Sequence, residues 1–388
     1  MRKASLDPPS PDSACAAAAA PWHCTAPVSA ARKIRICIAA PSLDIYGGQA
    51  IQSVRLMRAL GTEPELEIGF IPHNPRLPWP LQWLQRVKYV RTGVTTFYYL
   101  LLLLWRVPRY DIIQAFSASY WSYLLSVMPP LLVAKLYRKK IILNYRSGEA
   151  EDHLQRWPRT TVPLMKRMDA IVVPSGYLVD VFARFGLKAR SIFNIVDIER
   201  FNYRERAVLE PRFMCCRLLE PLYNVANVIR AFKLIKDEVP EATLTIAADG
   251  SQRANLEKLV ADLKLDSVTF SGFVPFDRMP ALYDAHDVHL IGNDIDNMPA
   301  AITESCATGI IVVTTDAGGI PYIVENGRSA LTVPCGDVAG LAREALRALR
   351  DPELARRLAR NARERARDFT WPRVRGQWLA LYHELVGR

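Results

Sequence analysis

The chain has 388 residues, half of them hydrophobic, with a mean hydropathy of +0.02 and a net charge of +11. This length predicts two or three domains, and no apolar run reaches the ~18–20 residues of a membrane-spanning helix. The charge excess lies in residues 1–199, with 25 Lys and Arg against 14 Asp and Glu, whereas residues 200–388 hold 25 of each kind. Because no nucleic-acid motif appears, the basic half favours an anionic membrane or lipid as partner over nucleic acid.

The seven cysteines are scattered along the chain. They form neither a Cys-x-x-Cys pair nor a Cys/His spacing typical of metal sites. We therefore expect reduced thiols in a cytoplasmic protein and no bound metal.

Residues 1–31 are rich in Ala, Pro and Ser and lack the apolar periodicity of a folded element. This composition predicts a disordered leader. A signal peptide is disfavoured, because the alanine run lacks large apolar residues and follows Asp7 and Asp12.

The first predicted element is a strand over Lys33–Ala40, which a loop connects to a helix over Gln49–Leu60. A strand, a glycine-containing loop and a helix start can cradle phosphates, because unpaired N–H groups point outward from the helix start. Gly47 and Gly48, at the end of this loop, are therefore candidate ligand contacts. Paired glycines are not specific to ligand sites, since many turns between a strand and a helix carry them.

The stretch from Leu81 to Val107 combines basic and apolar residues. Leu81–Arg91 is amphipathic, and Val94–Val107 is the most apolar run of the chain, with Arg106 and Arg109 near its end. Aromatic and basic residues at the edges of an apolar helix suit a membrane interface. We favour a helix that packs on the sheet over a helix at the membrane interface. A partly exposed helix could do both.

Strands and helices alternate through the rest of the first half. The expected strands are Glu67–Pro72, Asp111–Phe116, Lys140–Tyr145 and Ile171–Val173, and the expected helices are Ser117–Leu136 and a helix that Ser175 caps. The loop that starts at Arg146 follows one of these strands.

The alternation restarts in the second half. The expected strands are Phe213–Cys216, Ala242–Ala247, Val268–Phe270 and Val288–Gly292, and the expected helices are Val225–Lys236, Gln252–Leu263, Met279–Ala285 and a helical pair over 339–367. This pattern predicts an α/β fold with parallel sheets covered by helices on both faces. Arg217 follows the first of these strands, where open α/β sheets bind ligands, and its guanidinium could grip a diphosphate. A purely structural arginine is the alternative.

The stretch Asn293–Asn326 has the composition of a ligand site. We expect a polar loop, a helix over Ala300–Thr308 that ends at Gly309, and a strand over Ile310–Thr314. Pro299 suits the first helical position, and the free N–H groups of that helix start suit a diphosphate.

Two carboxylates and two glycines give this stretch its chemistry. Asp296 and Glu304 stand eight residues apart, near one helical face if the helix begins early. One could accept bonds from ribose hydroxyls and the other from sugar hydroxyls. Gly318 and Gly319 would allow close backbone approach to a ligand.

This stretch resembles the donor-site signature of glycosyltransferase family 4, in which two acids eight positions apart precede a glycine-rich turn. Glu304 matches the second acid, and Asp296 stands in place of the first. The Asn194 and Asp197 that precede Phe201 resemble the family's interdomain boundary. The resemblance covers roughly Lys33–Leu385.

The resemblance implies a GT-B fold, with two Rossmann-like domains whose parallel sheets face each other across a cleft. It implies a retaining glycosyltransferase that takes sugar from a nucleotide diphosphate sugar, without metal or cofactor, and passes it to a lipid-linked or polysaccharide acceptor. Arg217 would then hold the diphosphate with the helix start at Met298 and Pro299. Glu304 would hold the ribose and Asp296 the sugar, which makes the Asp-Ile-Asp spelling at 294–296 incidental.

Three positions depart from the family pattern. Arg146 stands where a histidine commonly lies near the reacting carbon, Tyr223 replaces a lysine that assists Arg217, and Asp296 replaces a glutamate. His153 is the nearest imidazole, although a surface histidine on a helix is the commoner outcome. These departures favour one alternative, a non-catalytic GT-B protein that acts as a binding or scaffold partner in polysaccharide assembly. A sugar epimerase is another, but we identify no acid–base pair for it.

The resemblance also predicts a domain organisation. After the leader, the first domain spans 32–201, a hinge spans 202–211, the donor domain spans 212–368, and a helix within 369–388 returns to the first domain. We expect a cytoplasmic protein, with peripheral attachment to the inner face of the cell membrane through the basic half as a further expectation.

Overall fold

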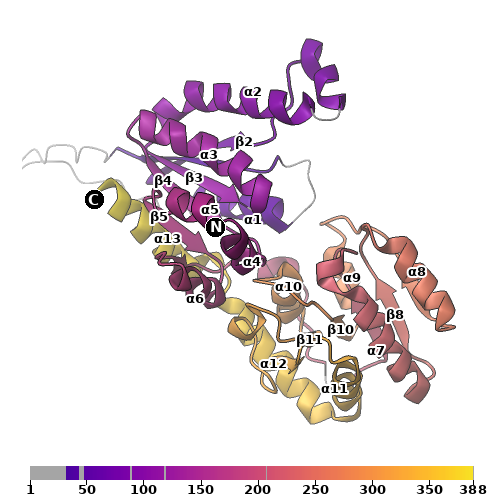
Figure 1. Cartoon of the computed structure of the whole chain (residues 1–388). Coiled ribbons are helices and arrows are strands. Elements are labelled where there is room, and N and C mark those ends of the chain that lie inside the picture. Colours follow the sequence, from indigo (N-terminus) through magenta and orange to yellow (C-terminus); the bar gives the residue numbers. More distant parts are fainter. Residues whose placement is uncertain (1–31, 43–47, 88–89, 118, 207, 388) are drawn as a thin grey trace, which may run out of the picture. The chain divides into compact units, whose positions relative to one another are not determined.

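The computed structural model describes residues 32–42, 48–87, 90–117, 119–206 and 208–387. The expected leader over 1–31 and the loop residue Gly47 therefore lie outside the described residues. From Lys33 onward the described residues belong to one compact unit (Figure 1).

The first half of this unit is built on a six-stranded parallel sheet with the order β2-β1-β3-β4-β5-β6. The strands are β1 (Ile34–Ala40), β2 (Leu66–Pro72), β3 (Ile112–Ser117), β4 (Lys140–Tyr145), β5 (Ala170–Val173) and β6 (Arg190–Ser191). Strands β1, β3 and β4 are buried almost throughout, which explains why they read as continuous apolar runs in the sequence.

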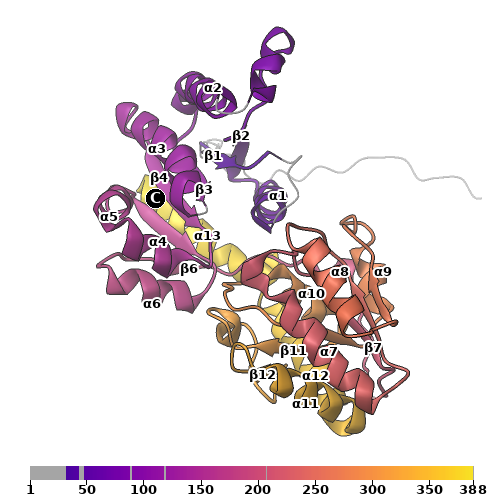
Figure 2. The ribbon, with the colours of Figure 1, turned by 45° about the vertical axis from the view of Figure 1, so that its right-hand side comes forward.

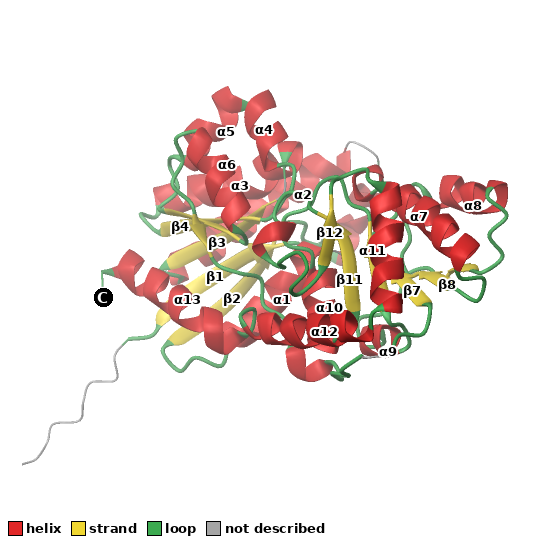
Figure 3. Ribbon diagram, turned by 90° about the horizontal axis from the view of Figure 1, so that it is seen from below, coloured by secondary structure: helices red, strands yellow, loops and turns green. Residues whose placement is uncertain are grey.

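The second half has its own six-stranded parallel sheet, with the order β12-β11-β10-β7-β8-β9. The strands are β7 (Arg212–Cys215), β8 (Thr243–Ile246), β9 (Val268–Phe270), β10 (Val288–Ile291), β11 (Ile311–Thr315) and β12 (Leu331–Val333). Figure 3 shows strands of both sheets with helices packed around them. The predicted α/β class with two Rossmann-like sheets is confirmed.

Helices connect the strands as expected, with ends that differ from the predictions by a few residues. The helices are α1 (Gly48–Leu60), α2 (Val90–Arg106), α3 (Tyr120–Leu136), α4 (Ala150–Arg156), α5 (Pro158–Met165), α6 (Gly176–Arg184), α7 (Val225–Glu238), α8 (Arg253–Asp262), α9 (Met279–Asp284), α10 (Ala300–Thr308), α11 (Val338–Arg350), α12 (Pro352–Arg367) and α13 (Trp371–Val386). A 3₁₀ helix, η1 (Trp79–Arg86), precedes α2.

Helix α13 completes the core of the first half although it follows the second half in sequence. Trp378 and Tyr382 pack with Ile36 and other strand residues of the first sheet. The Tyr382 hydroxyl donates to Gln114 Oε1 at 2.8 Å. At the start of the helix, Arg375 donates two bonds to Glu63, at 2.7 and 2.6 Å. The chain therefore passes between the halves twice, before β7 and again between α12 and α13.

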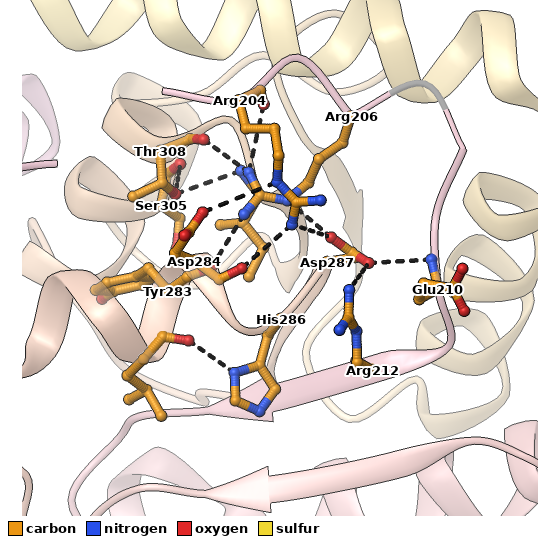
Figure 4. Close-up of polar contacts among 12 residues, drawn as sticks. Arg204, Arg206, Glu210, Arg212, Tyr283, Asp284, His286, Asp287, Ser305 and Thr308 are labelled. Atoms are coloured by element: carbon orange, nitrogen blue, oxygen red, sulfur yellow. Dashed lines mark hydrogen bonds and ion pairs between the residues drawn. The ribbon is translucent and has the colours of Figure 1, made fainter. Parts of the chain in front are cut away.

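The first of these connections is held to the second half by a buried acid, Asp287 (Figure 4). Arg206, with a fully buried side chain, donates to Asp287 Oδ1 at 3.0 Å, and Arg204 donates to the same oxygen at 2.8 Å. Arg212 and the Glu210 N–H donate to Oδ2. Several donors thus compensate one buried carboxylate, which stabilises it away from water. The expected hinge segment is accordingly bonded to the second half from Arg204 onward.

Candidate functional site

A cavity of about 1360 Å³ lies between the carboxyl-end loops of the two sheets and draws its lining from both halves. The first half contributes α1, the loop after β4 and the segment 194–200, and the second half contributes the loop after β7 and the start of α10. Ligands of open α/β sheets bind outside the carboxyl ends of the strands, so this cavity is the candidate site.

Glu304 lies in this cavity with both carboxylate oxygens engaged. Arg55 from α1 donates to Oε1 at 2.7 Å, and the Tyr283 hydroxyl donates to Oε2 at 3.2 Å. The side chains of Arg55 and Glu304 are 7% and 8% exposed, so the ion pair is almost dry. Each oxygen has a further lone pair, and a hydroxyl group of a ligand can therefore still donate to this carboxylate.

Asp296 and Arg217 form the second ion pair of the cavity, with 2.5 Å between Arg217 Nη2 and Asp296 Oδ2. Asn293 also donates to Oδ2, at 2.6 Å, and the Asn297 N–H donates to Oδ1. The Arg217 guanidinium lies 4.2 Å from the ring centre of Tyr223, so the residue in the place of a family lysine stacks on the arginine. Burial raises the pKa of Asp296, and Arg217 opposes that shift.

Helix α10 begins at Ala300, as predicted, but Pro299 is its N-cap and not its first helical residue. Asp296 therefore lies in the preceding loop, and the early helix start that would place it on one helical face with Glu304 does not occur. The backbone at Pro299 is extended, with ψ of 124°, so the helix cannot begin before Ala300. Asn194 of the first half bonds both the Met298 carbonyl and the Met298 sulfur, each at 3.2 Å, and this fixes the helix start.

Gly318 and Gly319 serve the loop that carries Asp296. A Cβ on Gly318 would overlap the Asp296 carbonyl oxygen, and one on Gly319 would overlap the Asn297 carbonyl oxygen. The Gly319 N–H donates to the Asp296 carbonyl at 3.0 Å. Neither glycine is among the residues that line the cavity, and their contact with a ligand stays a prediction. Gly48 does line it.

Arg146 lines the cavity at the end of β4, where the sequence placed it. Its Nε donates to Asn144 Oδ1 at 2.6 Å, and its guanidinium lies 5.2 Å from the ring centre of Phe116. The Nη1 atom is buried without a hydrogen-bond partner among the described residues. Burial lowers the pKa of Arg146 to about 9.

His153 does not reach the cavity, and its candidacy as the imidazole near the reacting carbon is wrong. It is fully buried in α4, with its Nδ1 3.0 Å from the Tyr145 hydroxyl and its Nε2 3.3 Å from the Thr161 hydroxyl. Burial lowers its pKa to about 4. His153 lies on the buried face of α4, where its ring packs among the aromatic rings of Tyr123, Tyr145 and Trp157.

Sequence reasoning missed several polar residues of the site. Gln52 accepts a bond from the Ile195 N–H at 3.1 Å, and Arg55 donates to the Ile195 carbonyl. Arg200 lies 3.6 Å from the ring centre of Phe276. A signal existed in α1, because Gln52 and Arg55 stand three residues apart, on one side of a helix that follows a glycine loop.

The cavity is rich in N–H donors that lack an acceptor. Among the described residues, buried guanidinium nitrogens without a hydrogen-bond partner occur on four cavity-lining arginines: Arg55, Arg146, Arg200 and Arg217. Buried donors without partners are rare in folded proteins because each one destabilises the fold. Anions with several oxygens, such as phosphates, are the ligands that guanidinium groups bind best. The described residues contain no group of His, Cys, Asp and Glu with metal-site geometry.

Residues 204–365 match the family model of the glycosyl transferases group 1. The chain is 25% identical over 208 residues to N-acetyl-alpha-D-glucosaminyl L-malate synthase from Bacillus anthracis, covering 51% of this chain and 54% of that protein. It is 28% identical over 203 residues to a GDP-mannose-dependent alpha-(1-6)-phosphatidylinositol monomannoside mannosyltransferase from Mycolicibacterium smegmatis, covering 48% and 53%. The alignments span between 54% and 65% of the first three curated relatives.

Solved structures with a similar fold cover nearly the whole chain. Anabaena HepE in complex with UDP-glucose matches with a TM-score of 0.72 and 18% identity, over 91% of this chain and 99% of that one. Sucrose-phosphate synthase from Thermosynechococcus elongatus matches with a TM-score of 0.76 and 19% identity, over 92% and 100%. The group 1 match does not single out family 4. Residues 204–365 therefore match the glycosyl transferases group 1, and the two parallel sheets have the GT-B fold of these solved structures.

Proposed function

We propose that the protein is a retaining glycosyltransferase that moves a sugar from a nucleoside diphosphate sugar to a lipid-linked or polysaccharide acceptor. The observation that carries this proposal is the set of four cavity arginines with unpartnered buried N–H groups among the described residues. A diphosphate supplies the charged oxygens that such groups need, and charge-assisted bonds from arginine to phosphate are strong.

In this proposal the cations stabilise the leaving group. The bond between the anomeric carbon and a diphosphate oxygen breaks, and negative charge develops on that oxygen. Arg217 and the N–H groups at the start of α10, around Met298 and Pro299, hold the diphosphate in the cavity, where fixed charges can stabilise the developing negative charge. Arg146 supplies a further cation from the first half. No metal ion or cofactor takes part in these steps.

The two cavity carboxylates position the donor. Glu304 accepts bonds from ribose hydroxyls through the lone pairs that Arg55 and Tyr283 leave open, and Asp296 accepts bonds from the sugar. The acceptor hydroxyl attacks the anomeric carbon from the face that the diphosphate leaves, and its proton passes to a diphosphate oxygen. The new bond then has the configuration of the old one.

The comparisons guide the choice of substrates to test. HepE was solved with UDP and UDP-glucose, so UDP is the first nucleotide to try, with GDP as the rival. The name of the relative from Mycolicibacterium smegmatis includes phosphatidylinositol monomannoside, which is a lipid, and this supports a lipid acceptor for this chain.

Calorimetric titration of the purified chain with UDP and with GDP tests the donor site. We expect micromolar binding of one nucleotide, and at least about tenfold weaker binding after Arg217→Ala, because a charged partner of the diphosphate is lost. Arg343→Ala, which removes a 64% exposed arginine of α11, is the matched control and should bind like the wild type. If the folded wild type binds neither nucleotide, the donor-site proposal is wrong.

A non-catalytic GT-B protein is the second candidate, because no histidine lines the cavity among the described residues. That candidate predicts nucleotide binding without turnover. Release of UDP or GDP from a panel of nucleotide sugars, with and without lipid and glycan acceptors, separates the two. Transfer to any acceptor rejects the non-catalytic candidate.

A further inference from the structure

Large apolar side chains are exposed mainly in one part of the chain. Of the twenty exposed large hydrophobic residues among the described ones, fourteen lie between Trp79 and Tyr137. They sit on η1, α2 and α3 or directly after η1 and α3, and the most exposed include Trp79 at 85% and Trp121 at 68%. Contiguous exposed apolar surface on this scale marks an interaction site.

On α3 the exposed apolar residues form a single stripe. They are Trp121, Leu125, Met128, Leu132 and Leu136. Their spacing of three or four residues places them on one face of the helix. The opposite face holds Tyr123, Val127 and Leu131, which are buried against the first sheet. Helix α3 is thus apolar on both sides, and only one side is covered.

Helix α2 repeats this arrangement beside α3. Phe97, Leu101 and Trp105 are exposed at a spacing of four residues, while Tyr99 and Leu103 are buried. The two helices are in contact, because the Tyr99 hydroxyl donates to the Ser126 carbonyl and the Tyr137 hydroxyl donates to the Leu104 carbonyl. Figures 1 and 2 show α2 and α3 as neighbours over the first sheet. We call the exposed apolar residues of η1, α2 and α3 the apolar–basic surface.

The charge around this surface is one-sided. The sequence from His73 to Lys140 contains ten Lys and Arg and a single acid, Asp111. Arg106 and Arg109 lie 5.6 and 4.9 Å from the ring centre of Trp105, so basic groups stand directly beside an exposed aromatic ring. Tryptophan beside arginine at the edge of an apolar helix is the composition of a membrane-interface segment.

Charge decides between the possible occupants of the surface. A second copy of the chain would bring the same cations against these, and like charges repel. An anionic bilayer complements both properties, because its acyl region takes the apolar side chains and its phosphates attract the cations. None of the described helices is long and apolar enough to cross a membrane.

We propose that the apolar–basic surface docks this protein on an anionic lipid bilayer. The exposed Trp and Leu side chains enter the boundary between headgroups and acyl chains, and the surrounding Arg and Lys side chains bind lipid phosphates. This inference goes beyond the proposed transfer reaction and does not depend on it, since it concerns residues outside the cavity.

Flotation of the purified chain with vesicles tests the proposal. We expect binding to vesicles that mix phosphatidylcholine with phosphatidylglycerol, weak binding to phosphatidylcholine alone, and release by high salt, which screens the charges. The double variant Leu132→Asp with Leu136→Asp should bind at least about tenfold less, because charged side chains are expelled from the acyl boundary. Arg109→Glu with Arg138→Glu should lose the preference for phosphatidylglycerol.

Matched controls come from the second half. Leu234→Asp on α7 changes a leucine that is 42% exposed. Arg343→Glu on α11 changes an arginine whose side chain is 64% exposed. Both should float like the wild type. Circular dichroism and thermal unfolding show whether the surface variants keep their fold, as exposed positions should allow.

Three outcomes would overturn the proposal. They are a wild type that floats with neither vesicle, a wild type that floats equally with both at any salt concentration, and surface variants that float like the controls. If, in addition, the wild type sediments as a dimer that Leu132→Asp with Leu136→Asp converts to a monomer, the occupant is a second copy of the chain.

Discussion

The two halves share an architecture of six parallel strands, yet they place their charges and apolar side chains differently. The second half has equal numbers of basic and acidic residues, and it buries Asp287 among three arginines. The first half holds the whole charge excess and, among the described residues, most of the large apolar side chains that are exposed. The family match begins at residue 204, at the connection into the second half. The two halves thus share a fold but differ in surface charge and in exposed apolar area.

The largest expected effect concerns the buried acid of the second half. Asp287→Ala leaves Arg206 buried without its counter-ion, so we expect a loss of about 3–5 kcal/mol in the free energy of unfolding. Asp284→Ala is the control, because its side chain is 49% exposed and its contact with Arg204 is 3.8 Å long. Urea unfolding measures both. Equal losses in the two variants would show that the Asp287 cluster does not stabilise the second half.

The first half has its own buried acid, Glu63, which anchors α13 through Arg375 and Trp371. Glu63→Gln should lower stability less than Asp287→Ala, because Arg375 is half exposed and water can replace the lost bonds. The control is Glu384→Gln, which breaks an exposed pair with Arg190 and should change little.

Glu63 also predicts a pH dependence. Hydrogen bonds from Arg375, followed by the effect of Trp371, lower the pKa of this acid in the folded state below its ordinary value of 4.5, against the opposing effect of burial. The unfolded state therefore binds the proton more readily, and this contribution to stability is complete above pH 4.5 and lost as the pH falls through the folded pKa. Unfolding curves between neutral and acidic pH should fall less steeply for Glu63→Gln. Identical slopes would contradict this assignment.

The smallest expected effect lies between the halves. Glu304→Gln should weaken nucleotide binding or slow turnover by at least about tenfold, or roughly 1.4 kcal/mol, because ribose loses a charged acceptor. Asp284 does not line the cavity, so Asp284→Gln is the control and should bind and turn over like the wild type in both assays. A Glu304→Gln variant with unchanged binding and turnover would remove Glu304 from the site.

The sequence predicted local structure best where strong local signals bound an element. Helix α10 begins and ends where expected, because Pro299 precedes it and Gly309 ends it in a left-handed conformation, with φ of 75°. Strand β4 also has the predicted ends, since it is a short apolar run that ends at a polar loop. Arg217 lies in the cavity because the end of a strand in a parallel sheet fixes its location.

Partners that come from distant parts of the chain could not be predicted. Ser175 precedes α6 as expected, but its hydroxyl bonds Asn297 of the other half in place of its own helix. Glu304 finds Arg55 across 249 positions of sequence, and a local pattern carries no information about such a pairing. The same holds for His153, whose spacing along the sequence could not show that α4 turns it into the core.

Helix α13 has a consequence for the order in which the protein matures. Trp378 and Tyr382 belong to the core of the first half, although they are synthesised after the entire second half. While the ribosome is still producing residues 212–367, the first sheet lacks the helix that covers part of it. The second half can therefore complete its core first, and the first half closes afterwards. A fragment that stops at residue 201 should accordingly leave the ribosome with an uncovered apolar face and depend on chaperones.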